Sequence, residues 1–382
     1  MNYLLITEYF PESEEAEFTG GIEARCFYFV KEMSKRHNIT VLCSHLQGQR
    51  RVSKVFNAKV IRCGPTTKYS NQGCVLSRLS TAVSFYSQGW KIKNIDIVEG
   101  SSFLTYLPAY FLANKLKAKK VATWHETWIG EWIKNKGFPV GFFGSVWERI
   151  ATKLNWDLIV SVSTFTKKRL MRKGVEKNKI LIFPNGIESK QFQLIKAKKH
   201  KEPTICYFGR INGPKNLDLL IKAVSIIRKK NKNVKCKILG SGPALTDLKK
   251  LVKKLRLKNH VTFTGRIENF EDYLKEAKKC QIYVHPSTLE GFGITVLEAL
   301  SLNLPYVITN IAPFIEVTKN GRGGLIFKQN NLKELVEKIT KLLNDKKLYL
   351  KKINEGQTLL KEYDWKTIIN KYEESILCLL RK

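Results

Sequence analysis

The chain of 382 residues has few acidic residues and no long apolar run. Asp and Glu number 33 against 67 Lys and Arg, which gives a formal net charge of +34 at pH 7. No stretch reaches the roughly 18–20 apolar residues that a membrane-spanning helix needs, so any membrane contact is expected to be peripheral. Residues Met1–Leu5 are apolar but lack the basic start and cleavage site of a signal peptide. We expect a cytoplasmic protein, and we leave open whether it attaches peripherally to the cytosolic face of a membrane.

Cysteine pairs at metal-binding spacing are also missing. The eight cysteines are scattered and none forms a C-x-x-C pair, so a zinc site is not expected. Several lie within apolar stretches, where a free cysteine behaves as a small hydrophobic residue. This cysteine usage fits a reducing cytosol.

The excess of positive charge has two interpretations. One is a lysine-rich proteome, as in thermophiles with many surface Lys and Glu residues. The other is an anionic partner, either nucleic acid or an anionic membrane surface. The lysines are spread along most of the chain, which favours the first interpretation, and no recognised nucleic-acid-binding motif appears. We therefore expect no nucleic-acid partner and keep a membrane surface as a hypothesis.

The pattern of apolar segments indicates an α/β protein. Short apolar strands alternate with amphipathic helical segments along most of the chain, as in doubly wound parallel sheets. A chain of 382 residues is long enough for two domains rather than one. The polar, lysine-rich segment 188–202 interrupts the alternation, and we interpret it as the linker between them.

One stretch in the second half predicts a ligand-binding junction. Gln281–His285 is a short apolar strand, Ser287–Gly293 a turn with two glycines, and Ile294–Leu302 a helix, followed by the strand Pro305–Thr309. A strand–turn–helix unit of this kind points backbone N–H groups and a helix N-terminus at one spot. Such a spot suits an anion, for example a phosphate group.

Two glutamates flank this junction. Glu290 lies on the turn and Glu298 eight residues later, about 12 Å along a helix at 1.5 Å per residue. The two carboxylates are therefore too far apart to chelate one ion, but they can hold two ends of an elongated ligand through paired hydroxyls. The plain alternative is a βαβ unit with surface glutamates. Glu298 fits that alternative less well, because apolar residues surround it in the sequence.

Two basic residues follow another predicted strand. Pro203–Phe208 is apolar, Arg210 comes two residues after it, and Lys215 opens a helix predicted to run to Lys230. Two cations five residues apart at a strand–helix junction can hold both phosphates of a diphosphate, the Arg as a fork and the Lys as a point charge. The alternative is a pair of solvated surface charges, and their placement at the junction argues against it.

The first half offers weaker signals at similar junctions. The predicted strand Asn2–Thr7 leads into the turn Phe18–Ile22, which contains Gly20 and Gly21. His125 directly follows a later strand, at the end where ligands gather in open α/β sheets. Taken alone, the turn is equally well a tight loop, and a lone histidine is more often structural.

Two further segments bear on a membrane surface. Thr127–Arg149 carries three Trp and three Phe with few acids, and we favour a buried helical hairpin over an exposed aromatic patch at a membrane interface. Ser163–Lys173 is a predicted helix capped by Ser163. Its basic residues are Lys167, Lys168, Arg169, Arg172 and Lys173.

These motifs together resemble a known family. Glu290-Gly-Phe-Gly followed by Glu298-Ala-Leu, with flanking HPS and LP, resembles the E-x7-E signature of retaining nucleotide-sugar glycosyltransferases of family 4. The FGR…KN pattern and the turn PNGI at 184–187 resemble other motifs of the same family. The resemblance implies a GT-B fold with two doubly wound Rossmann-like domains facing across a cleft, the second like that of glycogen synthase. We expect an acceptor-binding domain at 1–187, the linker at 188–202, a nucleotide-sugar domain at 203–362 and a returning helix at 363–382.

The resemblance also implies roles for single residues. Arg210 and Lys215 would bind the donor diphosphate. Glu298 would bind the ribose hydroxyls, and Glu290 would hold the sugar hydroxyls. His125 would contact the sugar or the acceptor. Further donor contacts are implied for Gly20, Gly21, Gly209, Gly265, Ile267, Gly291, Phe292, Gly293 and Ile294. No cofactor or metal ion is expected, because two cations face the diphosphate and no Asp-x-Asp cluster is evident.

The implied reaction is retaining transfer of a hexose from a nucleoside-diphosphate sugar to an acceptor. A lipid, a lipid-linked saccharide or a cell-surface glycan precursor is the expected acceptor. One departure from the family is Glu126, where an Asp is often found. The alternatives are a sugar-nucleotide epimerase of the same fold and, from a different class, a basic nucleic-acid-binding protein.

Overall fold

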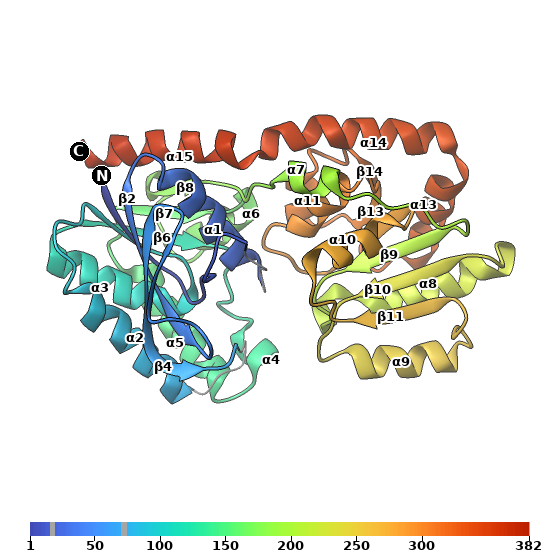
Figure 1. The fold of residues 1–382 in the computed structure, drawn as a ribbon. Helices are drawn as coiled ribbons and strands as arrows, with labels where there is room; N and C mark the ends of the chain where they lie inside the picture. Colours follow the sequence, from blue (N-terminus) through green and yellow to red (C-terminus); the bar gives the residue numbers. More distant parts are fainter. Residues whose placement is uncertain (16–19, 70–74, 382) are drawn as a thin grey trace. The chain divides into compact units, whose positions relative to one another are not determined.

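The computed structural model describes residues 1–15, 20–69 and 75–381. The chain forms two compact units, shown in Figure 1. Unit 1 comprises Met1–Asn185 together with Trp365–Lys382, and unit 2 comprises Gly186–Asp364. The expected linker 188–202 contains the short helix α7 (Ser189–Leu194) and falls within unit 2. Among the described residues, no helix is both long and apolar enough to cross a membrane.

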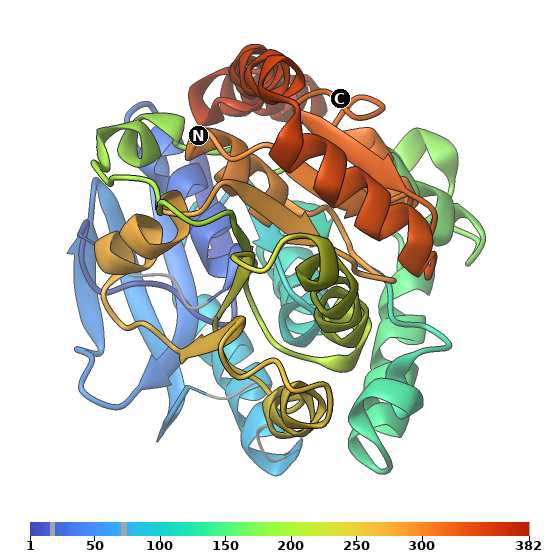
Figure 2. The ribbon, with the colours of Figure 1, turned by 90° about the vertical axis from the view of Figure 1, so that its right-hand side faces the viewer.

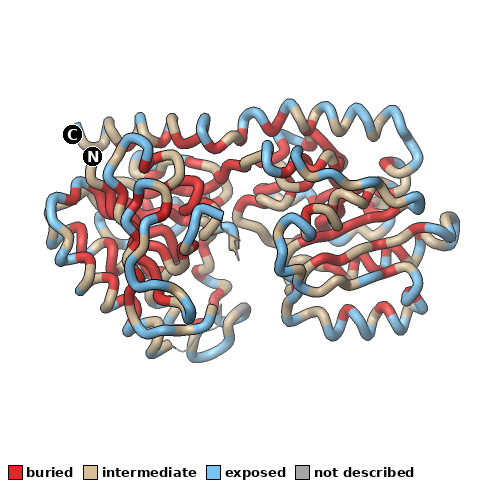
Figure 3. Tube along the Cα trace, viewed as in Figure 1, coloured by how far each residue is buried: buried red, intermediate tan, exposed pale blue. Residues whose placement is uncertain are grey.

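Unit 1 is built on an eight-stranded sheet in the order β3-β4-β2-β1-β5-β6-β7-β8. All neighbouring strands are parallel except β3, which runs antiparallel to β4 at the edge. The strands are β1 (Asn2–Ile6), β2 (Asn38–Leu46), β3 (Val52–Val55), β4 (Ala58–Thr67), β5 (Ile97–Gly100), β6 (Lys119–Trp124), β7 (Leu158–Ser161) and β8 (Ile180–Ile182). The central strands are buried along almost their whole length, as Figure 3 shows, which explains their continuous apolar sequence.

Helices cover the sheet of unit 1 in two groups. Helix α1 packs against α15, and α2 packs against α3, which in turn meets α5. Because parallel crossovers are right-handed, these groups lie on opposite faces. The helices are α1 (Gly21–Met33), α2 (Val75–Gly89), α3 (Tyr106–Leu116), α4 (Trp132–Lys136), α5 (Val140–Lys153), α6 (Thr164–Met171) and α15 (Trp365–Leu380). The predicted cap of α6 is confirmed, since Ser163 Oγ accepts a hydrogen bond from Thr166 N at 3.0 Å.

The aromatic tract Thr127–Arg149 divides its side chains between core and surface. It forms the helical hairpin α4–α5, in which Trp132 Nε1 donates to the buried carboxylate of Glu148 at 2.6 Å. The expectation of a wholly buried hairpin is wrong for the phenylalanines, because a helix that packs by one face leaves the other in solvent. The exposed ones are Phe138, Phe142 and Phe143.

Unit 2 is built on a six-stranded, fully parallel sheet in the order β11-β10-β9-β12-β13-β14. Its strands are β9 (Thr204–Phe208), β10 (Lys235–Leu239), β11 (Val261–Gly265), β12 (Ile282–His285), β13 (Tyr306–Thr309) and β14 (Gly324–Phe327). One helical layer consists of α9, α8 and α13, and α11 packs with α14 and α7 in the other. Figure 2 shows the ribbon from a second direction. The helices are α8 (Leu217–Lys230), α9 (Leu245–Lys254), α10 (Phe270–Lys278), α11 (Ile294–Ser301), α12 (Ala312–Val317), α13 (Leu332–Asn344) and α14 (Lys346–Leu360).

The predicted helix after Arg210 starts later than expected. Gly213–Lys215 forms a short 3-10 turn, Asn216 adopts a left-handed φ of 53°, and α8 begins only at Leu217. Lys215 therefore lies on a loop ahead of the helix rather than within its first turn. The kink turns the chain sharply between the strand and the helix.

A buried carboxylate joins α15 to the sheet of unit 1. Glu99 on β5 accepts hydrogen bonds from Thr123 Oγ1 at 2.6 Å, from Tyr372 OH of α15 at 3.0 Å and from Tyr3 OH. Tyr3 and Tyr372 also lie 3.0 Å apart at their hydroxyls. A buried carboxylate is stable only when its oxygens are paired, so the network makes α15 part of the core of unit 1.

We predict that Tyr372→Phe destabilises unit 1. The variant keeps the ring and leaves Glu99 with one donor fewer, which costs about 1–3 kcal/mol. The melting temperature should fall by several degrees in a thermal melt. Ser375→Ala, on the exposed side of the same helix, serves as the control. An equal melting temperature for both variants would refute the role given to this network.

Candidate functional site

The strand order of unit 2 brings two loops together. The chain leaves β9 toward β10 on one side, and β12 pairs with β9 on the other, so the order reverses between these strands. Ligands of open α/β sheets bind at such a reversal, outside the carboxyl ends of the strands. The loop after β9 carries Arg210 and Lys215, and the loop after β12 carries Glu290. Residues 75 positions apart thus become neighbours.

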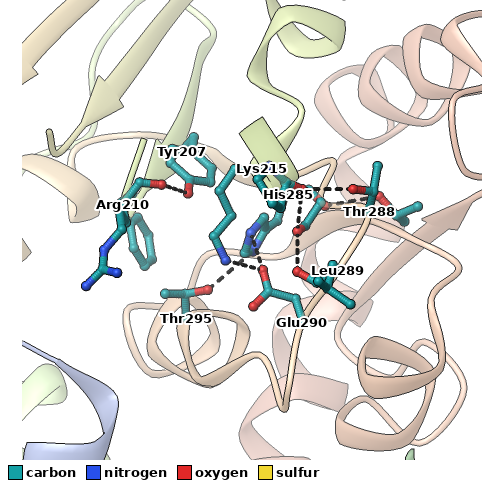
Figure 4. Close-up of polar contacts among 12 residues, drawn as sticks. Tyr207, Arg210, Lys215, His285, Thr288, Leu289, Glu290 and Thr295 are labelled. Atoms are coloured by element: carbon teal, nitrogen blue, oxygen red, sulfur yellow. Dashed lines mark hydrogen bonds and ion pairs between the residues drawn. The ribbon is translucent and has the colours of Figure 1, made fainter. Parts of the chain in front are cut away.

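An ion pair joins the two loops, as Figure 4 shows. Lys215 Nζ lies 2.6 Å from Glu290 Oε1, with both side chains largely buried. His285, the last residue of β12, places Nε2 3.0 Å from the same oxygen, although that nitrogen makes no well-directed hydrogen bond. One carboxylate oxygen therefore faces a cation and an imidazole.

The charge of Lys215 decides the ionisation of Glu290. Burial raises the pKa of the Glu290 carboxyl, but the charge of Lys215 and the neighbouring His285 outweigh it and hold this pKa at about 2. Burial lowers the pKa of His285, so its imidazole is neutral near pH 7. The site thus holds a fixed carboxylate, a fixed ammonium and a neutral histidine.

Backbone contacts lock the two loops in register. The carbonyl oxygen of Pro214 accepts from Thr288 N at 2.8 Å, from Ser287 Oγ at 2.9 Å and from Thr288 Oγ1 at 3.2 Å. Ser287 Oγ also reaches the carbonyl of Leu289 at 3.0 Å. These bonds sit one residue before Lys215 and within three residues of Glu290, so they fix the spacing of the ion pair.

Arg210 lies on the same loop as Lys215, and its charge is available to a ligand. Its backbone carbonyl accepts from Tyr207 OH at 2.8 Å, which anchors the loop. The guanidinium is exposed and makes no hydrogen bond or ion pair with any other described residue. Gly209 precedes it with a φ of 134°, a conformation that favours glycine.

The turn after Glu290 requires its second glycine. Gly293 has a φ of 95°, and a Cβ there would lie 2.7 Å from the ring of Phe314. Helix α11 starts at the next residue, Ile294. Phe292 is buried and its ring meets that of Tyr363, so only the backbone of this position remains for a ligand. Gly291 precedes it on the same turn.

Glu298 lies four residues into α11 without a partner. Its carboxylate makes no hydrogen bond or ion pair within the described part of the chain, and the residue is only partly exposed. Burial raises the pKa of this carboxyl to about 7. A carboxylate held in this way lacks hydrogen-bond donors, and a ligand with hydroxyl groups would supply them.

The exit of β11 carries two further predicted positions. Gly265 adopts a φ of 72° and its carbonyl accepts from Gly240 N at 2.9 Å, so the loops after β10 and β11 are joined. Ile267 follows, partly exposed.

Unit 1 holds the remaining predicted residues. Gly20 is the N-cap of α1. Gly21 and Ile22 are already helical, so the predicted turn Phe18–Ile22 ends earlier than expected, and its residues Phe18 and Thr19 lie outside the described residues. His125 follows β6, and burial, followed by the charge of Arg25, lowers its pKa to about 3. Its Nε2 is buried without a hydrogen-bond partner in the described residues.

Sequence reasoning missed the residues that support Glu290. His285 enters the sequence analysis only as the end of a strand and part of the flanking HPS, Ser287 as part of HPS and of the turn, and Thr288 as part of the turn. A signal for His285 existed, because a histidine that ends a buried strand five residues before a glutamate is within reach of it. No sequence signal shows that the Pro214 carbonyl would be the acceptor for Ser287 and Thr288.

Comparison with known families agrees with this architecture. Residues 19–191 match the model described as Glycosyltransferase Family 4, and residues 188–359 match the model described as Glycosyl transferases group 1. An uncharacterized glycosyltransferase of Haemophilus influenzae is 29% identical over 57% of this chain and 60% of its own length. The capsular polysaccharide biosynthesis glycosyltransferase CapM of Staphylococcus aureus is 30% identical over 56% of this chain and 58% of its own length. The chain thus spans about three fifths of these relatives.

Solved structures share the fold over the full length. Sucrose-phosphate synthase from Thermosynechococcus elongatus superposes with a TM-score of 0.82 at 17% identity, covering 100% of this chain and 99% of that one. Anabaena HepE in complex with UDP-glucose gives a TM-score of 0.73 at 16% identity, covering 99% and 100%. The two doubly wound sheets therefore form a two-domain GT-B fold. With both family matches in place, the chain belongs to the glycosyltransferases of the family 4 type.

We predict a pH-dependent cost from Glu298. The pKa of its carboxyl in the folded chain, about 7, lies above the value in the unfolded chain. At pH values between these two pKa values, the folded state therefore binds more protons than the unfolded state. Stability should therefore fall as pH rises from about 5 to 8. Glu298→Gln removes this slope, and the melting temperature of the wild type relative to the variant should drop across that range. Glu337→Gln, an exposed position, is the control. Parallel pH curves for wild type and Glu298→Gln would contradict the burial of this carboxyl.

Proposed function

We propose that the protein transfers a hexose from a nucleoside-diphosphate sugar to an acceptor hydroxyl, with retention of the anomeric configuration. One observation carries this proposal: Lys215 is paired with Glu290 at the strand reversal of unit 2, and the unpaired guanidinium of Arg210 belongs to the same loop as Lys215. Two cations and one carboxylate at this point match a diphosphate joined to a polyhydroxyl group.

The chemistry follows from where charge develops. When the bond between the anomeric carbon and the diphosphate oxygen breaks, its electron pair stays on the diphosphate and the sugar becomes oxocarbenium-like. Cations fixed before the reaction stabilise the growing negative charge most strongly in the transition state. Arg210 and Lys215 are assigned this role, with backbone N–H groups at the start of α11. The acceptor hydroxyl attacks from the same face and gives its proton to the departing phosphate.

The carboxylates are assigned to the two ends of the donor. Glu290, ionised and held by Lys215, accepts hydrogen bonds from sugar hydroxyls. Glu298, which has no partner in the described chain, accepts from the ribose hydroxyls. His125 is assigned to the sugar or acceptor because its neutral ring has an unpartnered nitrogen. The printed title of HepE, a complex with UDP-glucose, makes UDP-sugars the first donors to test.

We further propose that the acceptor is a lipid or a lipid-linked saccharide met at an anionic membrane. Helix α5 presents an apolar stripe to solvent at positions i, i+1, i+4 and i+8, flanked by the exposed Arg149 and Lys153. The stripe consists of Phe142, Phe143, Val146 and Ile150. Aromatic and basic residues together favour the interface of an anionic bilayer. The relative CapM is named for capsular polysaccharide biosynthesis, which fits a surface-glycan precursor.

Only some of the basic residues of helix α6 and its C-terminal end are available to a membrane surface. Lys167 donates its amine to the carbonyl of Ile180 at 2.7 Å, and Arg169 lies over the ring of Phe165. Lys168, Arg172 and Lys173 remain exposed. Each basic residue near an anionic bilayer contributes about 1 kcal/mol, in a salt-dependent manner.

We predict that Arg210→Ala and Lys215→Ala each lower kcat/KM by about 100-fold or more, the scale of losing one transition-state charge partner. The double variant should be less than additive, because both residues act on one leaving group. Steady-state kinetics with the donor that the wild type uses measures this. Arg228→Ala, remote on α8, is the matched control. Wild-type rates from both single variants would overturn the assignment of the diphosphate.

We predict that the protein co-sediments with anionic vesicles and that binding weakens from low to high salt. Phe142→Ser with Phe143→Ser, or joint neutralisation of Lys168, Arg172 and Lys173, should reduce the bound fraction. Leu350→Ser, an exposed apolar residue of α14 in unit 2, is the control and should leave binding unchanged. If the wild type stays in the supernatant with anionic vesicles at low salt, the membrane acceptor is wrong, whereas the donor site stands on its own test.

A further inference from the structure

A second polar chain runs behind Glu290. Tyr283 and His285 are two residues apart on β12, so their side chains leave the sheet on the same face. The hydroxyl oxygen of Tyr283 lies 2.9 Å from His285 Nδ1 and 2.9 Å from Thr295 Oγ1, so its single proton can be donated to either atom. Thr295 Oγ1 is 3.3 Å from the same ring nitrogen. In Figure 4, dashed lines join Thr295 to His285 and join Glu290 to Lys215 and His285.

The surroundings of His285 fix which nitrogen carries the proton. The ring is buried, with 2% exposed, and a neutral imidazole has a single N–H. Nδ1 faces two hydroxyl groups, each of which can donate. Nε2 faces a carboxylate oxygen at 3.0 Å, which can only accept. Placing the lone pair of Nε2 against that oxygen would be repulsive, so the proton belongs on Nε2.

We propose that His285, held in its Nε2–H tautomer by Tyr283, is the positioning residue that fixes the Glu290 carboxylate for the donor sugar. The inference rests on the proposed function and adds to it a residue that touches no substrate. Lys215 also faces Glu290. The ring of Tyr207 packs edge-on against the ring of His285.

The Glu290 carboxylate needs a second hydrogen-bonding partner, because Lys215 both pairs with Glu290 and is proposed to bind the diphosphate. The ammonium faces Glu290 Oε1 at 2.6 Å, and in the proposed reaction it also binds the diphosphate, which competes for it. The donor of His285 meets the same oxygen and is not shared with the diphosphate. The N–H direction of His285 is not well aligned with that oxygen, and catalytic hydrogen bonds often align fully only in the substrate complex.

The contacts of Lys215 and His285 leave one carboxylate oxygen of Glu290 available to the substrate. Lys215 and His285 face Oε1, and Oε2 of Glu290 has no hydrogen bond or ion pair with the described residues. A carboxylate oxygen aimed at one sugar hydroxyl discriminates the configuration of that hydroxyl, because the wrong epimer leaves a buried acceptor unpaired. His285 therefore contributes to specificity between epimeric donors through the aim of Oε2.

Two substitutions of similar size separate the functions of the ring. In His285→Gln the amide ends near the position of Nε2 and keeps a donor toward Glu290. In His285→Asn the shorter amide ends near Nδ1 and keeps only the side facing Tyr283. His260 lies just before β11, and its ring contacts the carbonyl of Val234. His260→Asn is therefore the control for general effects of replacing a histidine by asparagine.

His285→Asn should lower kcat/KM for the wild-type donor by about tenfold to 100-fold, the scale of one hydrogen bond to a charged group. Discrimination against the epimeric donor should fall with it, while binding of the free nucleoside diphosphate, which lacks the sugar, should stay unchanged. His285→Gln should recover most of both losses. Equal losses in the two variants, or nucleotide binding that falls in step with turnover, would mean that His285 is only structural.

A spectroscopic measurement tests the tautomer without any donor. In the full chain labelled with ¹⁵N-histidine, the His285 signal, assigned by its absence in His285→Gln, should report a neutral Nε2–H ring at pH 7. Tyr283→Phe should increase the Nδ1–H fraction. A protonated ring at pH 7 or a dominant Nδ1–H form in the wild type overturns the proposal. If no donor is turned over, the proposed function fails, and the tautomer still decides whether His285 directs its proton at Glu290.

Discussion

The candidate site of unit 2, at the carboxyl ends of β9 and β12, depends on the buried ion pair between Lys215 and Glu290. Removal from water alone would raise the pKa of the Glu290 carboxyl, and the ammonium 2.6 Å away keeps it ionised. Such a pair is retained only with good geometry, since the cost of taking two charges out of water is large. The three hydrogen bonds onto the Pro214 carbonyl supply that geometry by joining the two loops. The same pair then presents one cation and one anion to a ligand.

The two units use their sheets in a similar way. In unit 2 the strand order reverses at β9 and β12, and in unit 1 it reverses at β1 and β5. Each reversal opens a space at the carboxyl ends of the strands where loop residues converge. Unit 2 fills its edge with charges, which suits a diphosphate. Near its own reversal, unit 1 places a neutral histidine, His125, with an unpartnered nitrogen, which suits hydroxyl groups.

The sequence predicted most of the fold and part of the site. The predicted strands Asn2–Thr7, Pro203–Phe208, Gln281–His285 and Pro305–Thr309 lie within one residue of β1, β9, β12 and β13, because buried parallel strands are continuous apolar runs. The segment between β2 and β5 was left unassigned, and there the antiparallel edge strand β3, the strand β4 and the helix α2 lie. Arg210, Lys215 and Glu290 were found from their junctions. His285 and the Pro214 contacts were not, because they depend on how two distant loops pack, which local patterns do not encode. Likewise, the aromatic composition of α4–α5 did not reveal which side chains face solvent.

The central claim is that the edge of unit 2 around Lys215 and Glu290 binds a nucleoside-diphosphate sugar. A thermal-shift titration of the full chain against UDP-, GDP- and ADP-sugars tests it most directly, since a ligand that binds the folded state raises the melting temperature by mass action. The account predicts that one of these nucleotide classes raises the melting temperature in a saturable manner and that Lys215→Ala loses the shift. No shift from any of the three, or an undiminished shift in Lys215→Ala, would contradict it.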